Sequence, residues 1–212
     1  MNFKTSSKVY AFRGEHPKGY ALGCLPTFRG RESILRRRAV KSLNLEVGNS
    51  VLDLACGTGR NFIYLQEAVG PEGRIIGFDY SAEMLEAAKK QVQNKKWKNV
   101  DLVQGDAAKL SLDYKVDGVL STLGISAMSN HQTALLRAVK NLKTGRRIAI
   151  MDAKPFEGIF SFLNPPIQPT YQKFADWDST RDIIGDLGKL VRDLVIEKHN
   201  FKTIYIATGI AR

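Results

Sequence analysis

The chain has 212 residues, of which 43% are hydrophobic, and this suits one compact domain with a sizeable core. No run of about 18 apolar residues occurs, which argues against a transmembrane helix. The first twenty residues lack the apolar middle region of a secretory signal, so we expect a cytoplasmic protein. Its two cysteines, Cys24 and Cys56, exclude a disulfide framework, and no metal site is expected.

The net charge is +11 and is unevenly distributed. Residues 1–48 contain ten Lys or Arg and three Glu, which leaves a net charge of +7 in this segment. A basic surface attracts phosphate-bearing partners, either nucleic acid or an anionic membrane surface. A solvated helix face explains the same charge equally well, so charge alone identifies no ligand.

Short apolar runs alternate with amphipathic stretches along most of the chain. A basic helix is expected at about 30–43, and further helices at about 59–69, 81–95, 130–141 and 181–198. Strands are expected at 50–55, 74–79, 99–104, 116–121, 146–152 and 201–209. This alternation predicts an α/β fold, with a Rossmann-like, doubly wound, mostly parallel sheet and helices on both faces.

Two regions stand apart from this alternation. Residues 1–48 form a basic helical segment that we expect to cover the acceptor side of a domain spanning 49–212. Residues 154–180 are rich in proline and aromatic residues, and Pro165, Pro166 and Pro169 exclude a continuous helix. A long segment of this kind after a strand is typical of a lid or substrate loop.

The stretch "VLDLACGTGRN" at 51–61 places a glycine turn after the first predicted strand. Gly57 and Gly59 permit a tight turn and a close approach of a ligand to the backbone. Phe62 occupies the place of the third glycine that a dinucleotide site requires. Asp53 would repel a pyrophosphate, whereas it would favour a ligand with an ammonium or sulfonium group. The turn therefore suits a cationic ligand better than NAD.

The next two strand ends also carry carboxylates. "GFDYS" places Asp79 where an acid accepts both hydroxyls of a ribose. "VQGDAAKL" places Asp106 where it can accept from an adenine amino group, while the Ala107 amide donates to a ring nitrogen. Together with Asp53, these residues predict a site for an adenosine that carries a cationic amino-acid tail.

The stretches "VLDLACGTGRN", "IIGFDYS", "DLVQGDAAKL" and "VDGVLSTLGIS" resemble the four cofactor motifs of class I S-adenosylmethionine-dependent methyltransferases. The resemblance covers about residues 45–153. "LRRRAVKSLNLEVGNS" and "VGPEGRIIGFDYSAEMLEAAKK" look most like the branch that modifies quinone precursors, phospholipid amines and other small molecules. That branch usually ends in an antiparallel strand pair. Only one clear strand is predicted after the fifth strand here, so we expect a seven-stranded sheet, or a six-stranded one if the seventh strand is missing or very short.

The resemblance implies S-adenosyl-L-methionine as cofactor, S-adenosyl-L-homocysteine as product, and methyl transfer by in-line displacement. It implies that the methionine part is held near the glycine turn, the ribose by Asp79, and the adenine by Asp106 and Ala107. The loop 122–126 would face the methyl group. The full implied set is Asp53, Ala55, Gly57, Gly59, Asn61, Asp79, Tyr80, Met84, Asp106, Ala107 and Ser121.

A general base is needed only if the acceptor arrives protonated. Weak candidates for a catalytic role are His131, Tyr20 and Tyr171, and none is assigned. The leading interpretation is a methyltransferase for a small-molecule or lipid-linked acceptor, with peripheral contact to an anionic membrane. The alternatives are an RNA methyltransferase, although no RNA-binding module is recognisable, and a non-catalytic S-adenosylmethionine-binding protein. The oligomeric state has no signal in the sequence.

Overall fold

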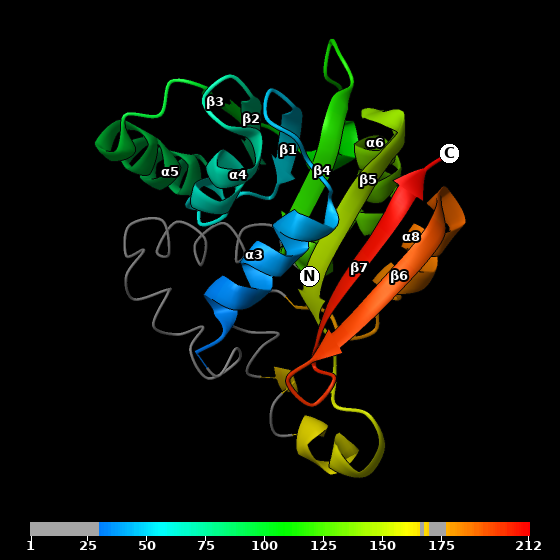
Figure 1. Cartoon of the computed structure of the whole chain (residues 1–212). Coiled ribbons are helices and arrows are strands. Elements are labelled where there is room, and N and C mark those ends of the chain that lie inside the picture. Colours follow the sequence, from blue (N-terminus) through cyan, green and yellow to red (C-terminus); the bar gives the residue numbers. More distant parts are fainter. Residues whose placement is uncertain (1–29, 166–167, 170–176) are drawn as a thin grey trace.

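The computed structural model describes residues 30–165, 168–169 and 177–212, and across these residues seven strands form one sheet (Figure 1). The strands are β1 Ser50–Leu54, β2 Arg74–Asp79, β3 Val100–Gln104, β4 Val116–Thr122, β5 Leu142–Ala153, β6 Val191–His199 and β7 Ile204–Ala211. The helices are α3 Glu32–Ser42, α4 Phe62–Val69, α5 Ala82–Lys95, α6 His131–Lys140 and α8 Ile183–Leu190. Short 3-10 turns are η1 Ala107–Lys109, η2 Ile125–Ala127 and η3 Gly158–Leu163.

The strand order is β3-β2-β1-β4-β5-β7-β6. Strands β1 to β5 are parallel, and β7 is antiparallel to both β5 and β6. The chain order reverses between β1 and β4, and in open α/β sheets the crevice at such a reversal binds ligands. The predicted Rossmann-like, mostly parallel sheet is confirmed.

Two apolar layers cover the sheet, one on each face. Helices α3, α4 and α5 pack on one face, with residues such as Leu35, Phe62 and Leu85 in the core. Helices α6 and α8 pack on the other face through residues such as Leu135 and Leu187. The central strands are buried on both sides, which explains their nearly continuous Val, Ile and Leu runs.

The helix predicted at 181–198 is wrong over its second half. Helix α8 ends at Leu190, and the chain continues directly as strand β6, which pairs with β7. Asp193 adopts a positive φ of 53°, and the strand register shifts between Arg192 and Val195, as in a β-bulge. Apolar residues at helical spacing continue into β6, but pairing with β7 overrides that local pattern. The expected seven-stranded sheet is confirmed, and its seventh strand is neither missing nor very short, because the sheet ends in the antiparallel pair β6–β7.

The basic helix predicted at 30–43 is α3, and several of its cations pair with carboxylates of the fold. Arg37 Nη1 lies 2.6 Å from Glu67 Oε2, and Arg38 Nη1 lies 3.4 Å from Glu197 Oε2. Arg36 is buried. Much of the α3 charge therefore serves contacts within the domain. Residues 1–29 lie outside the described part of the chain.

The segment 154–180 contains the turn η3, and it returns to the sheet at Trp177, whose indole Nε1 donates to the Ala153 carbonyl over 3.1 Å. Its role as a lid or substrate loop stays a prediction. Among the described residues, no helix has both the length and the apolar character needed to cross a bilayer.

Candidate active site

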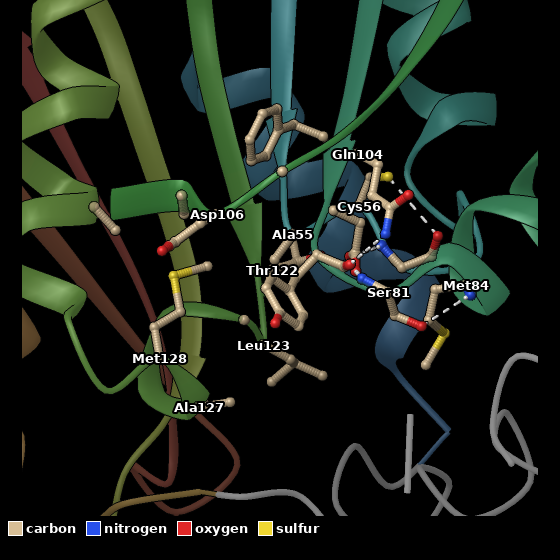
Figure 2. Close-up of a pocket in the computed structure, with 18 of the residues that line it drawn as sticks. Ala55, Cys56, Ser81, Met84, Gln104, Asp106, Thr122, Leu123, Ala127 and Met128 are labelled. Atoms are coloured by element: carbon tan, nitrogen blue, oxygen red, sulfur yellow. Dashed lines mark hydrogen bonds between the residues drawn. The ribbon is translucent and has the colours of Figure 1, made fainter. Parts of the chain in front are cut away.

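A cavity of about 440 Å³ lies at the carboxyl ends of β1 to β4 (Figure 2). Its volume falls in the range of pockets that enclose nucleoside-sized ligands. Seven of the eleven predicted cofactor residues line it, namely Ala55, Gly57, Asp79, Tyr80, Met84, Asp106 and Ala107. The sheet thus brings together strand ends that are far apart in the sequence.

The glycine turn after β1 is a tight, left-handed stretch of backbone. Ala55, Gly57 and Gly59 have φ values of 57°, 56° and 81°. Glycine adopts such angles readily, whereas an alanine there is strained, and strain of this kind gathers at ligand sites. Leu123, directly after β4, is also strained, with a φ of 59°, and it lines the same cavity.

Asp79 stands at the end of β2 in a frame of backbone amides. Its Oδ2 accepts from the Gly57 amide over 2.7 Å, and its Oδ1 accepts from the Ser81 amide over 3.0 Å. Burial raises the pKa of Asp79, while these hydrogen bonds lower it. Ser81 in turn caps α5, as expected, by accepting from the Met84 amide over 3.2 Å.

Asp106 follows β3 and begins the turn η1, where its Oδ1 accepts from the Ala108 amide over 2.9 Å. It is half-buried, and Ala107 beside it is buried. In Figure 2, Asp106 and Met128 stand on one side of the cavity, and Ser81 and Met84 stand on the other. The cavity therefore has a carboxylate at both the β2 end and the β3 end.

Asp53 and Asn61 do not line the cavity but lie buried behind its wall. Asn61 Nδ2 donates to Asp53 Oδ1 over 2.8 Å and to Thr122 Oγ1 over 2.9 Å. Asp53 Oδ2 has no hydrogen-bond partner within the described residues. Burial raises the pKa of Asp53 to about 7, so its negative charge is only partial at neutral pH.

Two arginines that the sequence analysis missed extend this network into the cavity. Arg36 donates from Nε to Glu32 over 2.7 Å, and from Nη1 to Asn61 over 2.7 Å and to Thr122 over 2.5 Å. Arg60 donates from Nη2 to Glu32 over 2.8 Å, and its buried Nη1 has no partner among the described residues. Both arginines line the cavity, so it contains cationic groups suited to a carboxylate. The four-residue spacing of Glu32 and Arg36 on the sheet-facing side of a helix was the available signal.

Gly59 and Ser121 also lie outside the cavity lining. A Cβ at Gly59 would lie 2.6 Å from the ring of Phe62, and one at Gly77 would lie 2.7 Å from the same ring. Phe62 thus fills the space between α4 and the sheet where a dinucleotide fold places its third glycine. Ser121 is buried on β4, and its Oγ has no partner within the described part of the chain.

Of the three weak catalytic candidates, only His131 lies among the described residues. His131 begins α6, and its Nε2 lies 3.1 Å from Asp186 Oδ2 on α8. It does not line the cavity, although its neighbour Asn130 does. Tyr20 and Tyr171 lie outside the described residues.

The loop after β4, which includes Leu123 and Ser126, forms one wall of the cavity and is fixed by hydrogen bonds. The Ser126 hydroxyl donates to Asp152 Oδ1 over 2.7 Å, and Arg181 Nη1 donates to the Ser126 carbonyl over 2.6 Å. Asp178 Oδ2 lies 3.3 Å from Arg181 Nε. Arg181 lines the cavity together with Leu123, so this wall combines an apolar surface with one guanidinium group.

A profile of the family described as "Methyltransferase domain" matches residues 45–207. The chain belongs to this family. The match covers β1 to β6, with the glycine turn and the three strand ends, and it ends within β7.

Named relatives of this methyltransferase are similar over most of its length. A demethylmenaquinone methyltransferase of Oceanobacillus iheyensis is 28% identical over 86% of this chain and 84% of its own length. One from Geobacillus is 29% identical over 74% of this chain and 75% of its own length. The structure of a SAM-dependent methyltransferase from Aquifex aeolicus has a TM-score of 0.61 at 21% identity, covering 84% of this chain and 89% of its own.

These similarities confirm the resemblance to class I S-adenosylmethionine-dependent methyltransferases and to their quinone-modifying branch. They confirm S-adenosylmethionine as the cofactor that the family implies, and they confirm a methyltransferase enzyme. The roles of single residues in binding it stay predictions.

Proposed function

We propose that this methyltransferase uses the cavity at the β1 to β4 ends to methylate a small, quinone-like acceptor that is linked to a lipid tail. Binding of the cofactor in this cavity is supported most by the pair of carboxylates, Asp79 and Asp106, which lie at neighbouring strand ends. The names of the relatives support the acceptor class. A cytoplasmic protein that contacts the membrane from its surface fits such an acceptor.

The residues present fit the cofactor. The Asp79 carboxylate is fixed by amides and keeps further acceptor positions for ribose hydroxyls. Asp106 and the Ala107 amide are the acceptor and donor for an adenine edge, and Tyr80 and Met84 line the same cavity. Arg36 and Arg60 are suited to the methionine carboxylate, since Arg60 Nη1 has no hydrogen-bond partner among the residues that the structure describes. When bound, S-adenosylmethionine supplies a methyl group already activated by a sulfonium.

The protein's own contribution to the reaction is alignment and exclusion of water. Leu123, Ala127 and Met128 provide an apolar wall for a flat ring. Arg181 is held rigidly on the same side and favours an acceptor whose ring oxygen becomes anionic. We propose that residues 154–180 and the segment 1–48 complete the cover on this acceptor side.

The test is transfer of a radiolabelled methyl group from S-adenosylmethionine to a prenylated naphthoquinol in vesicles. The reduced quinol has electron-rich ring carbons, whereas the oxidised quinone is an electrophile. We therefore expect labelled product with the quinol and none with the quinone. Parallel reactions contain total RNA and a phospholipid amine. Labelling of RNA with no labelling of the quinol would replace this proposal with the RNA methyltransferase alternative.

A further inference from the structure

A small apolar surface projects from the molecule at the end of the sheet where the cavity lies. It consists of Ile159, Phe160 and Phe162 on η3 and Phe201 in the β6–β7 turn, and we call it the apolar tip. These side chains are 83%, 38%, 69% and 56% exposed. Exposed clusters of large apolar side chains mark interaction sites rather than ordinary surface.

The apolar tip has a defined shape. The rings of Phe160 and Phe201 lie 5.5 Å apart at 54°, which joins the two segments. At the base of η3, the Asn164 side chain accepts from the Phe156 amide over 2.8 Å and donates to its carbonyl over 2.9 Å. A preformed apolar projection loses little conformational entropy when it binds a partner.

The position of the apolar tip follows from the strand topology. Strand β5 ends at Ala153, which pairs with Ile204, and His199 at the end of β6 pairs with the same residue. Both η3 and the β6–β7 turn therefore leave the sheet at the carboxyl end of its parallel strands. Figure 1 shows them together at the bottom of the view. The cavity lies at this same end of the sheet, so a surface that contacts the apolar tip also faces the end of the sheet that contains the cavity.

Charge around the apolar tip identifies the partner. Lys198 and Lys202 flank it and are exposed, whereas Lys154 is only 15% exposed and pairs with Glu157. Glu157 also contacts Lys198, and it is the one acid among residues 154–163 and 198–203. Apolar side chains flanked by exposed lysines suit a bilayer with anionic lipids, because the rings enter the interface while the ammonium groups remain at the headgroups.

We propose that the apolar tip inserts into the surface of an anionic membrane and so presents the cavity to a lipid-linked acceptor. The acceptor part of this inference rests on the proposed function, and the membrane part does not. The arginines of α3 are paired with Glu32, Glu67 and Glu197 within the fold.

The test is flotation of the full chain with vesicles of phosphatidylcholine alone or mixed with phosphatidylglycerol. We expect the wild-type protein to float with the anionic vesicles, and the double variant Ile159→Ser/Phe162→Ser to lose at least about tenfold in partitioning. The matched control is Val47→Ser, because Val47 is 71% exposed in the turn before β1, at the amino end of the parallel strands and so opposite to the tip. It should float like the wild type, and thermal melting checks that both variants are folded.

Methyl transfer separates this inference from the proposed function. Relative to the wild type, the double variant should lose several-fold more activity with vesicle-embedded quinol than with a short-chain, water-soluble quinol. If flotation depends on the apolar tip but no methyl group is transferred to either quinol, the quinol acceptor is rejected and the membrane proposal is retained. Wild-type protein that stays out of the anionic vesicles, or a double variant that floats equally well, would overturn the membrane proposal. The membrane proposal would also be overturned if the wild type is a dimer, the double variant is a monomer, and neither protein floats with vesicles.

Discussion

The Gly57 amide donates to the Asp79 carboxylate with 2.7 Å between N and Oδ2. This contact joins the glycine turn after β1 to the tip of β2, which are 22 residues apart in the chain. The carboxylate is therefore held in place before any ligand arrives, and the turn is held by the same bond. Preorganisation of this kind lowers the entropy cost of binding.

Asp79→Ala should weaken binding of S-adenosylhomocysteine. The loss of charge-assisted hydrogen bonds costs about 1–3 kcal/mol, or roughly 5- to 150-fold in Kd. Calorimetric titration measures the change. Asp101→Ala is the matched control, because Asp101 is an exposed β3 residue paired with Arg74, and it should bind like the wild type. Equal affinities for Asp79→Ala and the wild type would remove Asp79 from the ribose site.

Gly124→Ala should disturb the cavity by steric overlap alone. A Cβ at Gly124 would lie 2.5 Å from the Cβ of Ala55, which is a forbidden distance. We expect a loss of about 1–3 kcal/mol of unfolding free energy, as in overpacked cores, together with weaker cofactor binding. The double variant Ala55→Gly/Gly124→Ala should recover most of both, since it removes the clash and the positive-φ strain at Ala55.

The control for Gly124→Ala is Gly188→Ala in α8, whose new Cβ would lie 3.4 Å from Leu194 of β6, an ordinary contact distance. Alanine favours a helix over glycine by about 0.5–1 kcal/mol, so this variant should be neutral or more stable. Urea unfolding distinguishes the variants. If Gly124→Ala behaves like Gly188→Ala, the close contact between the two loops is not present in solution.

Arg36→Met should be strongly destabilising, whereas Arg37→Met on the same helix should not. Loss of Arg36 leaves Glu32 buried with less compensation and breaks bonds to Asn61 and Thr122, which costs about 3–5 kcal/mol. The Arg37–Glu67 pair is solvent-exposed and contributes about 0–1 kcal/mol. The midpoints of urea unfolding report both values, and similar midpoints would contradict a buried network.

Asp53 predicts a pH dependence of stability. Its pKa is raised from an ordinary value of 3.8 to about 7 in the folded state, so the folded chain holds a proton that the unfolded chain releases. The protonated Asp53 contributes fully to the free energy of unfolding below the pKa that it has in the unfolded chain. This contribution is lost as the pH rises to 7, by about 1.4 kcal/mol per pH unit. Asp53→Asn cannot titrate there, so its unfolding free energy should rise relative to wild type between pH 4 and 7. A pH-independent difference would show that Asp53 is ionised throughout.

Local patterns predicted most of the central fold. The β2 bounds and the Ser81 cap of α5 agree with expectation, because a buried apolar run and a capping residue act over a few neighbours. The failure at β6 has the opposite origin. Apolar residues from Ile183 to Val195 also fit a helix, and only pairing with β7 decides the outcome at Val191.

The candidate site shows the same division. Asp79 and Asp106 were predictable, since the end of a buried strand can be recognised in the sequence as the end of a short apolar run. The positions of Arg36 and Arg181 were not, because each reaches the cavity from an element far away in the chain and is fixed there by tertiary hydrogen bonds. Residues 131 and 186 illustrate a further limit, because the contact of His131 with α8 has no local signature.

Calorimetric titration of the wild-type chain with S-adenosylhomocysteine, beside an identical titration with NAD, tests the adenosine site most directly. We expect saturable binding of one molecule of S-adenosylhomocysteine per chain and no heat of binding from NAD. Saturable binding of NAD with no response to S-adenosylhomocysteine would contradict the assignment of the cavity.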